Sequence, residues 1–139
     1  MDDYRFELEL TVRFAETDAQ GIAHHAAYLV WFETARIEYL RRFDGGYQGL
    51  RDQGVEATTS EVHVRYIRPV TFDERLVIRT RCSEIRGARF RYEYRVERDG
   101  ETVAEGWTGH ACVDAKTLRP TRVPESLVAA IRAAEAAPP

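Results

Sequence analysis

The chain has 139 residues, of which 44% are hydrophobic, 11% aromatic and 31% charged, and its formal net charge is −3. This length fits one domain with a single hydrophobic core, and the apolar content excludes intrinsically disordered and fibrous proteins. Nucleic-acid-binding domains of this size usually carry a clear basic excess, so the charge argues against a nucleic-acid partner. We therefore expect residues 1–139 to form one domain that binds no nucleic acid.

A membrane-spanning helix is not expected, because the longest uninterrupted apolar run, Ala26–Phe32, has seven residues and a spanning helix needs about 20. The segment Met1–Glu7 is acidic and alternating, unlike the basic start and apolar centre of a signal peptide. Cys82 and Cys112 belong to no CxxC motif and match no histidine spacing typical of zinc sites. These features predict a cytoplasmic protein with reduced cysteines, no membrane contact and no bound metal.

The first predicted element is a half-buried strand over Tyr4–Phe14, where even positions are apolar or aromatic and odd positions polar or charged. Residues 16–21, Glu-Thr-Asp-Ala-Gln-Gly, are typical of a turn and end on a glycine that can adopt a positive φ. The apolar spacing then becomes helical over Ala26–Phe43, which predicts an 18-residue helix. Residues 44–46, Asp-Gly-Gly, are predicted to end it.

A loop with one short helical turn is predicted around Gly49–Gly54. Four strands are predicted to follow, over Ala57–Ile67, Glu74–Ile85, Arg89–Arg98 and Thr102–Ala115, and then a helix over Glu125–Ala136. The pair Asp99-Gly100 between two alternating runs is a strong hairpin signal. This order of elements predicts an α+β fold in which the long helix lies across one face of a curved five-stranded antiparallel sheet.

The segment before the long helix concentrates the residues that could carry chemistry. Asp18 lies in the turn, Gly21 follows it, and His24 and His25 directly precede the helix. A helix N-terminus presents unpaired backbone N–H groups, which suit a polarised carbonyl or an oxyanion. A carboxylate beside such a terminus could attack a carbonyl or activate water. The alternative is that Asp18 only tightens the turn, as aspartate often does.

The chain resembles the 4-hydroxybenzoyl-CoA thioesterase family of hotdog-fold enzymes over about residues 4–118. The motifs that carry the resemblance are the aromatic-x-Glu-x-Asp lead at 14–18, Gly21, His-His-x-x-Tyr at 24–28, Glu-x-x-Arg at 33–36, and Tyr-Ile-Arg-Pro-Val with a following aspartate at 66–73. Histidine at position 24 and alanine at position 27 depart from the tyrosine and asparagine common in the family. The acyl preference of a relative therefore does not transfer to this chain.

The resemblance implies that Asp18 is the catalytic carboxylate, acting as nucleophile or general base toward a thioester carbonyl. It implies that the backbone N–H of His25 polarises that carbonyl and that the His25 side chain orients the carboxylate or helps to protonate the leaving thiolate. Gly21 would shape the loop so that these groups converge, and Tyr28 would pack the helix start against the sheet.

Further residues are candidates for contact with the substrate. Glu33 and Arg36 lie three apart on the predicted helix and are close enough to form an ion pair. Glu33 is also the second-choice carboxylate, because another branch of hotdog thioesterases takes its catalytic carboxylate from this helix. The hydroxyl of Thr59 could reach the acyl group across a subunit boundary. His63 and His110 stand alone within strands and are interpreted as structural.

Arginine is concentrated in one stretch of the chain. Residues 63–95 contain nine arginines against four acids, and the default interpretation is a solvated strand face. Arginine side chains also suit the phosphates of coenzyme A. Arg86 and Arg89 flank Gly87 in a predicted hairpin that, in the family, lies near the nucleotide, so they are the preferred candidates.

The combined expectation is an acyl-CoA thioesterase that needs no cofactor other than coenzyme A as part of its substrate. The resemblance also implies a homodimer or homotetramer with the site at a subunit interface, which would cover an open sheet edge. The alternatives are a carrier-protein thioesterase with the same mechanism and a non-catalytic acyl-CoA-binding protein. A hotdog hydratase is disfavoured, because its Asp-x-Asn-x-x-His type of motif is absent: Gly21 and Ala23 follow Asp18.

Overall fold

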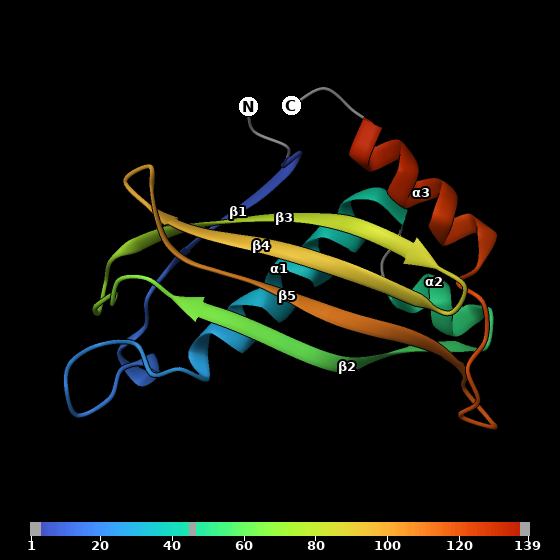
Figure 1. The fold of residues 1–139 in the computed structure, drawn as a ribbon, viewed down its shortest axis with the longest axis horizontal. Helices are drawn as coiled ribbons and strands as arrows, with labels where there is room; N and C mark the ends of the chain where they lie inside the picture. Colours follow the sequence, from blue (N-terminus) through green and yellow to red (C-terminus); the bar gives the residue numbers. More distant parts are fainter. Residues whose placement is uncertain (1–3, 45–46, 137–139) are drawn as a thin grey trace.

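A computed structural model describes residues 4–44 and 47–136, which form five antiparallel strands with a long helix against one face of the sheet (Figure 1). The elements are β1 Phe6–Thr11, a 3-10 turn Phe14–Glu16, α1 Ala27–Asp44, α2 Tyr47–Asp52, β2 Val55–Tyr66, β3 Arg75–Arg86, β4 Arg89–Arg98, β5 Glu101–Asp114 and α3 Glu125–Ala136. The strand order is β1-β3-β4-β5-β2, and every pair is antiparallel. The predicted α+β fold is thereby confirmed.

The predicted element bounds hold within one or two residues, except in the first strand. β4 and α3 have the predicted bounds, and α1 starts one residue later than predicted. β1 ends at Thr11, so the prediction of a strand through Phe14 is wrong. The chain turns there because the Glu16 N–H donates to the Arg13 carbonyl, which leaves the Phe14 side chain 75% exposed. Gly45 and Gly46, predicted to end the long helix, lie outside the described residues.

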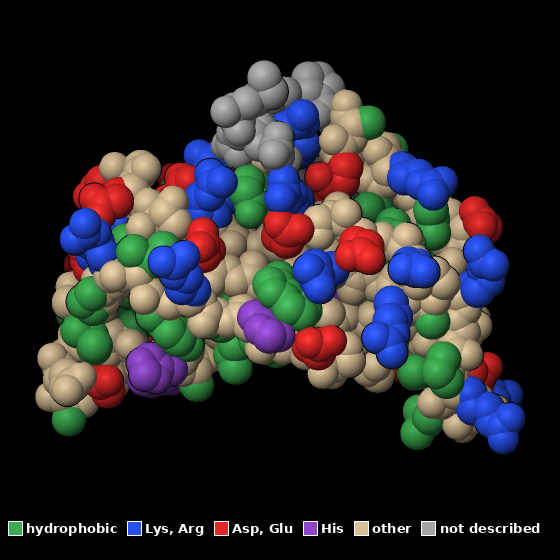
Figure 2. Space-filling view, viewed as in Figure 1, with side chains coloured by type: hydrophobic (Ala, Val, Ile, Leu, Met, Phe, Trp, Pro, Cys, Tyr) green, Lys and Arg blue, Asp and Glu red, His purple; other side chains and the backbone are tan. Residues whose placement is uncertain are grey.

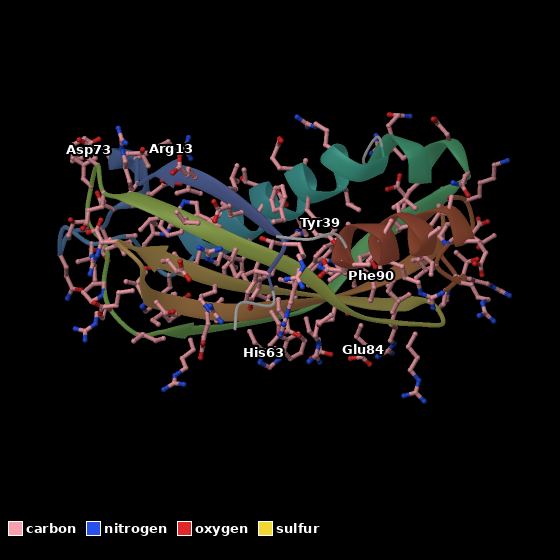
Figure 3. The ribbon with its side chains drawn as sticks, turned by 90° about the horizontal axis from the view of Figure 1, so that it is seen from above. Arg13, Tyr39, His63, Asp73, Glu84 and Phe90 are labelled. Atoms are coloured by element: carbon pink, nitrogen blue, oxygen red, sulfur yellow. The ribbon has the colours of Figure 1, made fainter. Side chains whose placement is uncertain are left out.

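The hydrophobic core lies between α1 and the inner face of the sheet. The Phe32 ring of α1 stacks on the Tyr94 ring of β4 with a centroid distance of 4.1 Å and an interplanar angle of 5°. Tyr39 lies two turns further along α1. Its ring meets the rings of Phe6 and Tyr92 edge to face, at centroid distances of 5.7 and 5.5 Å. Figure 3 shows Tyr39 between the helix and the strands. These aromatic contacts fix how α1 crosses the sheet, and so where its N-terminus lies.

The opposite, outer face of the sheet carries charged side chains, and acidic and basic groups alternate across it (Figure 2). Ion pairs join neighbouring strands, with N–O distances of 2.8 to 3.5 Å. They include Arg79–Glu7, Arg79–Glu97, Arg81–Glu93 and Arg65–Glu105. Near their centre, Trp107 lies between the His63 ring, 4.0 Å away, and the Arg91 guanidinium, 3.8 Å away. Several arginines of residues 63–95 therefore form ion pairs on the outer face of the sheet.

One long strand edge is open. β2 pairs with β5 alone, and its other edge meets no strand in the part of the chain that the structure describes. Val62 and Tyr66 on this strand are each 41% exposed. A 12-residue edge with exposed apolar side chains is a surface that proteins usually cover.

The carboxylate of Glu135 joins α3 to the core, where it accepts hydrogen bonds from the Tyr39 hydroxyl and from the Cys82 N–H. Cys82 and Cys112 are both free and buried, and burial raises the pKa of their thiols to about 12 and about 11. No helix within residues 4–44 and 47–136 combines the length and apolar character needed to cross a bilayer.

Candidate active site

The predicted turn at residues 16–21 is a tight loop that ends beside the start of α1. Thr17 and Ala23 form an isolated antiparallel bridge, and within it the Asp18 N–H donates to the Ile22 carbonyl at 2.9 Å. The Gly21 N–H donates back to the Asp18 carbonyl at 2.9 Å. Gly21 has φ +81°, a left-handed conformation that other residues adopt only with strain. The glycine thus permits the reversal that brings residues 23–25 back past Asp18.

The Asp18 side chain is exposed and has a fixed direction. Its Oδ1 accepts the Gln20 N–H at 2.8 Å, which is the turn-tightening contact that aspartate often makes. The same contact restrains the carboxylate at the outside of the loop, where a solvent molecule or a substrate can reach it. The turn-tightening and chemical interpretations of Asp18 are therefore compatible in this geometry.

At the N-terminus of α1 the Ala27 N–H is occupied, whereas the His25 N–H is available. The Ala27 N–H lies 3.1 Å from Nδ1 of His24, so this histidine caps the helix. The His25 N–H has no acceptor among residues 4–44 and 47–136. A free N–H at the positive end of an 18-residue helix is the kind of donor that a polarised carbonyl oxygen requires.

Glu16 anchors the loop to the helix, a role that the sequence analysis did not assign. Its carboxylate is buried and accepts the Arg13 N–H and the Trp31 Nε1–H, each at 2.8 Å. Its own carbonyl accepts the His24 N–H at 2.9 Å. Burial by itself would raise the pKa of Glu16. The hydrogen bonds that Arg13 and Trp31 donate to its carboxylate outweigh burial, so the pKa is lowered. A charged Glu16 therefore holds both ends of the Asp18 loop.

Tyr66, at the end of β2, forms the wall beside the helix start. Its hydroxyl donates to the His25 carbonyl at 2.8 Å, and its ring lies 4.6 Å from the His25 ring. Tyr28 is buried and meets the Tyr66 ring edge to face at 4.9 Å. Together with Ile22 and Pro69 these side chains line a cavity of about 240 Å³. Tyr28 thus packs the helix start, and Tyr66 is a site residue whose role the sequence analysis missed.

The remaining candidate residues line two other cavities of the structure. Glu33 and Thr59 line a second cavity, of about 420 Å³, between α1 and the first half of β2. Glu33 is paired with Arg36 at 3.7 Å, as predicted. Arg86 and Arg89 line a third cavity, of about 150 Å³, at the β3–β4 turn, at the opposite end of the sheet from the Asp18 loop (Figure 1). One copy of the chain therefore does not bring all the predicted site residues together.

His110 belongs to a buried polar chain under α1. Its Nε2 lies 2.7 Å from Thr108 Oγ1, which lies 2.7 Å from the Tyr94 hydroxyl, and its Nδ1 lies 3.4 Å from Thr59 Oγ1. Burial lowers the pKa of His110 to about 4, and the positive charge of Arg36 adds to this. His110 is thus a neutral, hydrogen-bonded histidine, whereas His63 is exposed and stacked on Trp107.

We expect His110 to make the protein less stable as the pH falls from 6.5 to about 4. In this window the unfolded chain binds a proton on this histidine that the folded chain rejects, so the free energy of unfolding falls, by up to about 3 kcal/mol. Urea unfolding at pH 7 and pH 4 measures the loss. The variant His110→Gln should lose less stability over the same interval, and an equal loss in both proteins would contradict the assignment.

Among the described residues, no three histidine, cysteine or acidic side chains are grouped so that they could hold a metal ion. The reacting groups that the structure offers are the Asp18 carboxylate, the His25 N–H and the His25 imidazole. Together they suit attack on an activated carbonyl.

Comparison with known proteins identifies the family of the chain. The model of the thioesterase-like superfamily matches residues 12–131. An acyl-CoA thioesterase, YbgC of Haemophilus influenzae, is 32% identical over 131 residues, which cover 94% of this chain and 96% of the relative. A thioesterase from Thermus thermophilus, solved in complex with coenzyme A and Zn, is 26% identical with a TM-score of 0.83, and the match covers all of both chains. A DHNA-CoA thioesterase from Staphylococcus aureus is 28% identical with a TM-score of 0.79, over 84% of this chain and 78% of that one.

The chain belongs to the thioesterase-like superfamily, and its fold is the hotdog fold of those enzymes, as the resemblance implied. Within that superfamily it is a thioester hydrolase.

Proposed function

We propose that the protein hydrolyses acyl-CoA thioesters to a free carboxylic acid and coenzyme A, with Asp18 as the catalytic carboxylate. One observation carries the proposal: the bridge between Thr17 and Ala23 places an exposed carboxylate in the same short loop as the free His25 N–H at the start of α1. A base or nucleophile and an oxyanion donor on one rigid loop are what acyl transfer from a thioester requires.

In the general-base form of the reaction, Asp18 takes a proton from a water molecule whose oxygen attacks the thioester carbon. The carbonyl oxygen becomes anionic and accepts the His25 N–H. The carbon–sulfur bond then breaks, and the thiolate takes up the proton held by Asp18, directly or through the His25 imidazole. In the nucleophilic form, the Asp18 carboxylate attacks first, expels the thiolate and leaves an anhydride that water hydrolyses. Neither form needs a metal or a redox cofactor.

Coenzyme A is the proposed carrier of the acyl group. The relatives are named for acyl-CoA and DHNA-CoA substrates, and one was solved with coenzyme A. In this chain, Arg86 and Arg89 line one cavity, and among the described residues neither guanidinium lies within 4.0 Å of a carboxylate. Two such arginines at a hairpin suit the phosphates of a nucleotide.

The proposed active unit is a homodimer formed by pairing two β2 edges, and two such dimers would make the homotetramer considered above. Antiparallel pairing about the centre of β2 places the Tyr66 end of one strand, with its His25 contact, beside the Val55 end of the other. Thr58, Ala111 and Arg89 lie in register on β2, β5 and β4. Asp18 of one copy would thus face Thr59 of the other copy. The hairpin that carries Arg86 and Arg89 of that other copy would lie beyond Thr59.

We also propose that this enzyme acts in the cytoplasm.

The proposal predicts release of one thiol per acyl-CoA consumed, measured with a thiol reagent on a panel of short, long and aromatic acyl-CoA substrates. Parallel reactions with the same acyl groups on acyl carrier protein test the rival carrier, which is favoured if only those thioesters are cleaved. Binding of acyl-CoA without thiol release from either carrier would instead identify a non-catalytic binding protein. Sedimentation of the same sample should show at least a dimer.

A further inference from the structure

The cavity between α1 and the first half of β2 has polar walls and contains a buried charge. It is the cavity of about 420 Å³ named above. The residues that matter in its wall are Glu33, Arg36 and Ile37 of α1, Ala57 and Thr59 of β2, and His110 of β5. None of these positions belongs to the Asp18 loop, so the cavity is a separate feature of the fold.

Arg36 is the charge that a group deep in this cavity would meet. The residue is 9% exposed, and a guanidinium stays protonated at any pH a protein experiences. The acid beside it, Glu33, is 3.7 Å away and 60% exposed, so it lies toward solvent. The other charged pair of the wall, Arg51 and Glu56, is joined within itself at 3.2 Å. Arg36 therefore puts a buried positive charge in the wall of the inner cavity, and burial strengthens a charge that solvent would otherwise screen.

The other polar groups of the cavity are neutral and held in place. Thr108 positions the His110 imidazole at 2.7 Å, and the Thr59 hydroxyl lies 3.4 Å from its second nitrogen. Ile37 and Ala57 supply apolar wall between them. A short aliphatic chain that ends in an anionic oxygen matches this arrangement: apolar contact along the chain, then a hydroxyl, then a guanidinium fork.

We propose that this cavity receives the far end of the acyl group and that Arg36 selects acyl groups that end in a carboxylate. The inference rests on the proposed thioesterase function and on the β2-paired dimer, in which the cavity of one copy lies beside the Asp18 loop of the other. Arg36 is then a specificity residue, and Glu33 at the mouth competes with the substrate carboxylate for the same guanidinium.

Two acyl-CoA substrates of equal chain length test this, glutaryl-CoA with a terminal carboxylate and pentanoyl-CoA without one. We expect the wild type to show the higher kcat/KM for glutaryl-CoA. The variant Arg36→Gln should lower the ratio of the two values by about 10- to 100-fold, the usual worth of a hydrogen bond to a charged group. Arg41→Gln is the matched control, because Arg41 is an exposed arginine of α1 paired with Glu38 outside the cavity, and it should leave the ratio unchanged.

A second variant keeps the proposal testable if Arg36→Gln does not fold. Glu33→Gln removes the competing carboxylate from an exposed position and should raise the ratio in favour of glutaryl-CoA. A ratio that is unchanged in Glu33→Gln, or in folded Arg36→Gln, overturns the proposal.

Equilibrium binding separates this proposal from the proposed function. It is measured by calorimetry with the inactive variant Asp18→Asn, which should bind glutaryl-CoA more tightly than pentanoyl-CoA. Preferential binding of glutaryl-CoA by Asp18→Asn, together with no thiol release by the wild type, would refute the hydrolysis and keep the cavity assignment. Thiol release from pentanoyl-CoA with no preference in binding would refute the cavity assignment alone.

Discussion

Replacing Asp18 by asparagine should lower the rate of thiol release from acyl-CoA by about 10²- to 10⁴-fold, the range that a positioned acid or base contributes. Asparagine has the same shape, and its side-chain oxygen can still accept the Gln20 N–H that the carboxylate accepts at 2.8 Å. The loop therefore keeps its conformation while the negative charge and the proton acceptor are lost. The effect should fall on kcat, and the affinity for acyl-CoA should change little.

Asp73→Asn is the matched control for this experiment. Asp73 is exposed, has φ +70° and donates its N–H to the Val12 carbonyl, so asparagine, which tolerates the left-handed region, should fit there. This variant should hydrolyse acyl-CoA at the wild-type rate. If Asp18→Asn also retained the wild-type rate, Asp18 would not be the catalytic carboxylate, and Glu33 would be the next candidate.

Replacing Gly106 by alanine should destabilise the protein by about 3 kcal/mol, at the upper end of the cost of overpacking a core. A β-carbon at this position would lie 2.3 Å from the His63 carbonyl oxygen and 2.9 Å from the Phe32 ring. The oxygen belongs to the backbone of β2 and cannot rotate away, so the sheet or α1 must shift. Phe32 also stacks on Tyr94, so the shift would loosen the contact that positions α1. The free energy of unfolding, measured with urea, tests the prediction.

Gly109→Ala provides the comparison on the same strand. An added β-carbon there would be no closer than 3.5 Å to any side chain, which is ordinary van der Waals contact. Its unfolding free energy should stay near the wild-type value. Equal stabilities of the Gly106 and Gly109 variants would show that β2 and α1 do not approach Gly106 as closely as described.

The fold was largely predictable because its signals are local. The alternation of apolar and polar residues in each strand, and the helical spacing of apolar residues in α1, can each be recognised within a single element. The hairpin between β4 and β5 was predicted from Asp99-Gly100, and both residues have positive φ, +51° and +80°. The first strand was predicted too long because its alternation continues to Phe14 even though its pairing with β3 ends at Thr11.

The site was predictable only in part because its contacts join distant positions. Trp31 reaches Glu16 across 15 residues, and Tyr66 reaches His25 across 41. The motifs contained Glu16 and Tyr66, but no spacing rule connects such pairs. The capping of α1 by His24 depends on a ring nitrogen whose direction the sequence does not encode.

The cross-strand ion pairs on the outer face bear on how the strands find their partners during folding. Arg79 of β3 binds Glu7 of β1 and Glu97 of β4, and Arg81 binds Glu93 one rung further along. A slip of one residue between β3 and β4 would turn these side chains toward the core face. A slip of two residues would keep them outside and would set Arg81 opposite Arg91 or Arg95, but the native register already sets Arg79 opposite Arg95, so the balance of like and unlike pairs would stay the same. The charges on this face thus disfavour a slip of one residue, which would bury them, and they do not distinguish the native register from a slip of two residues.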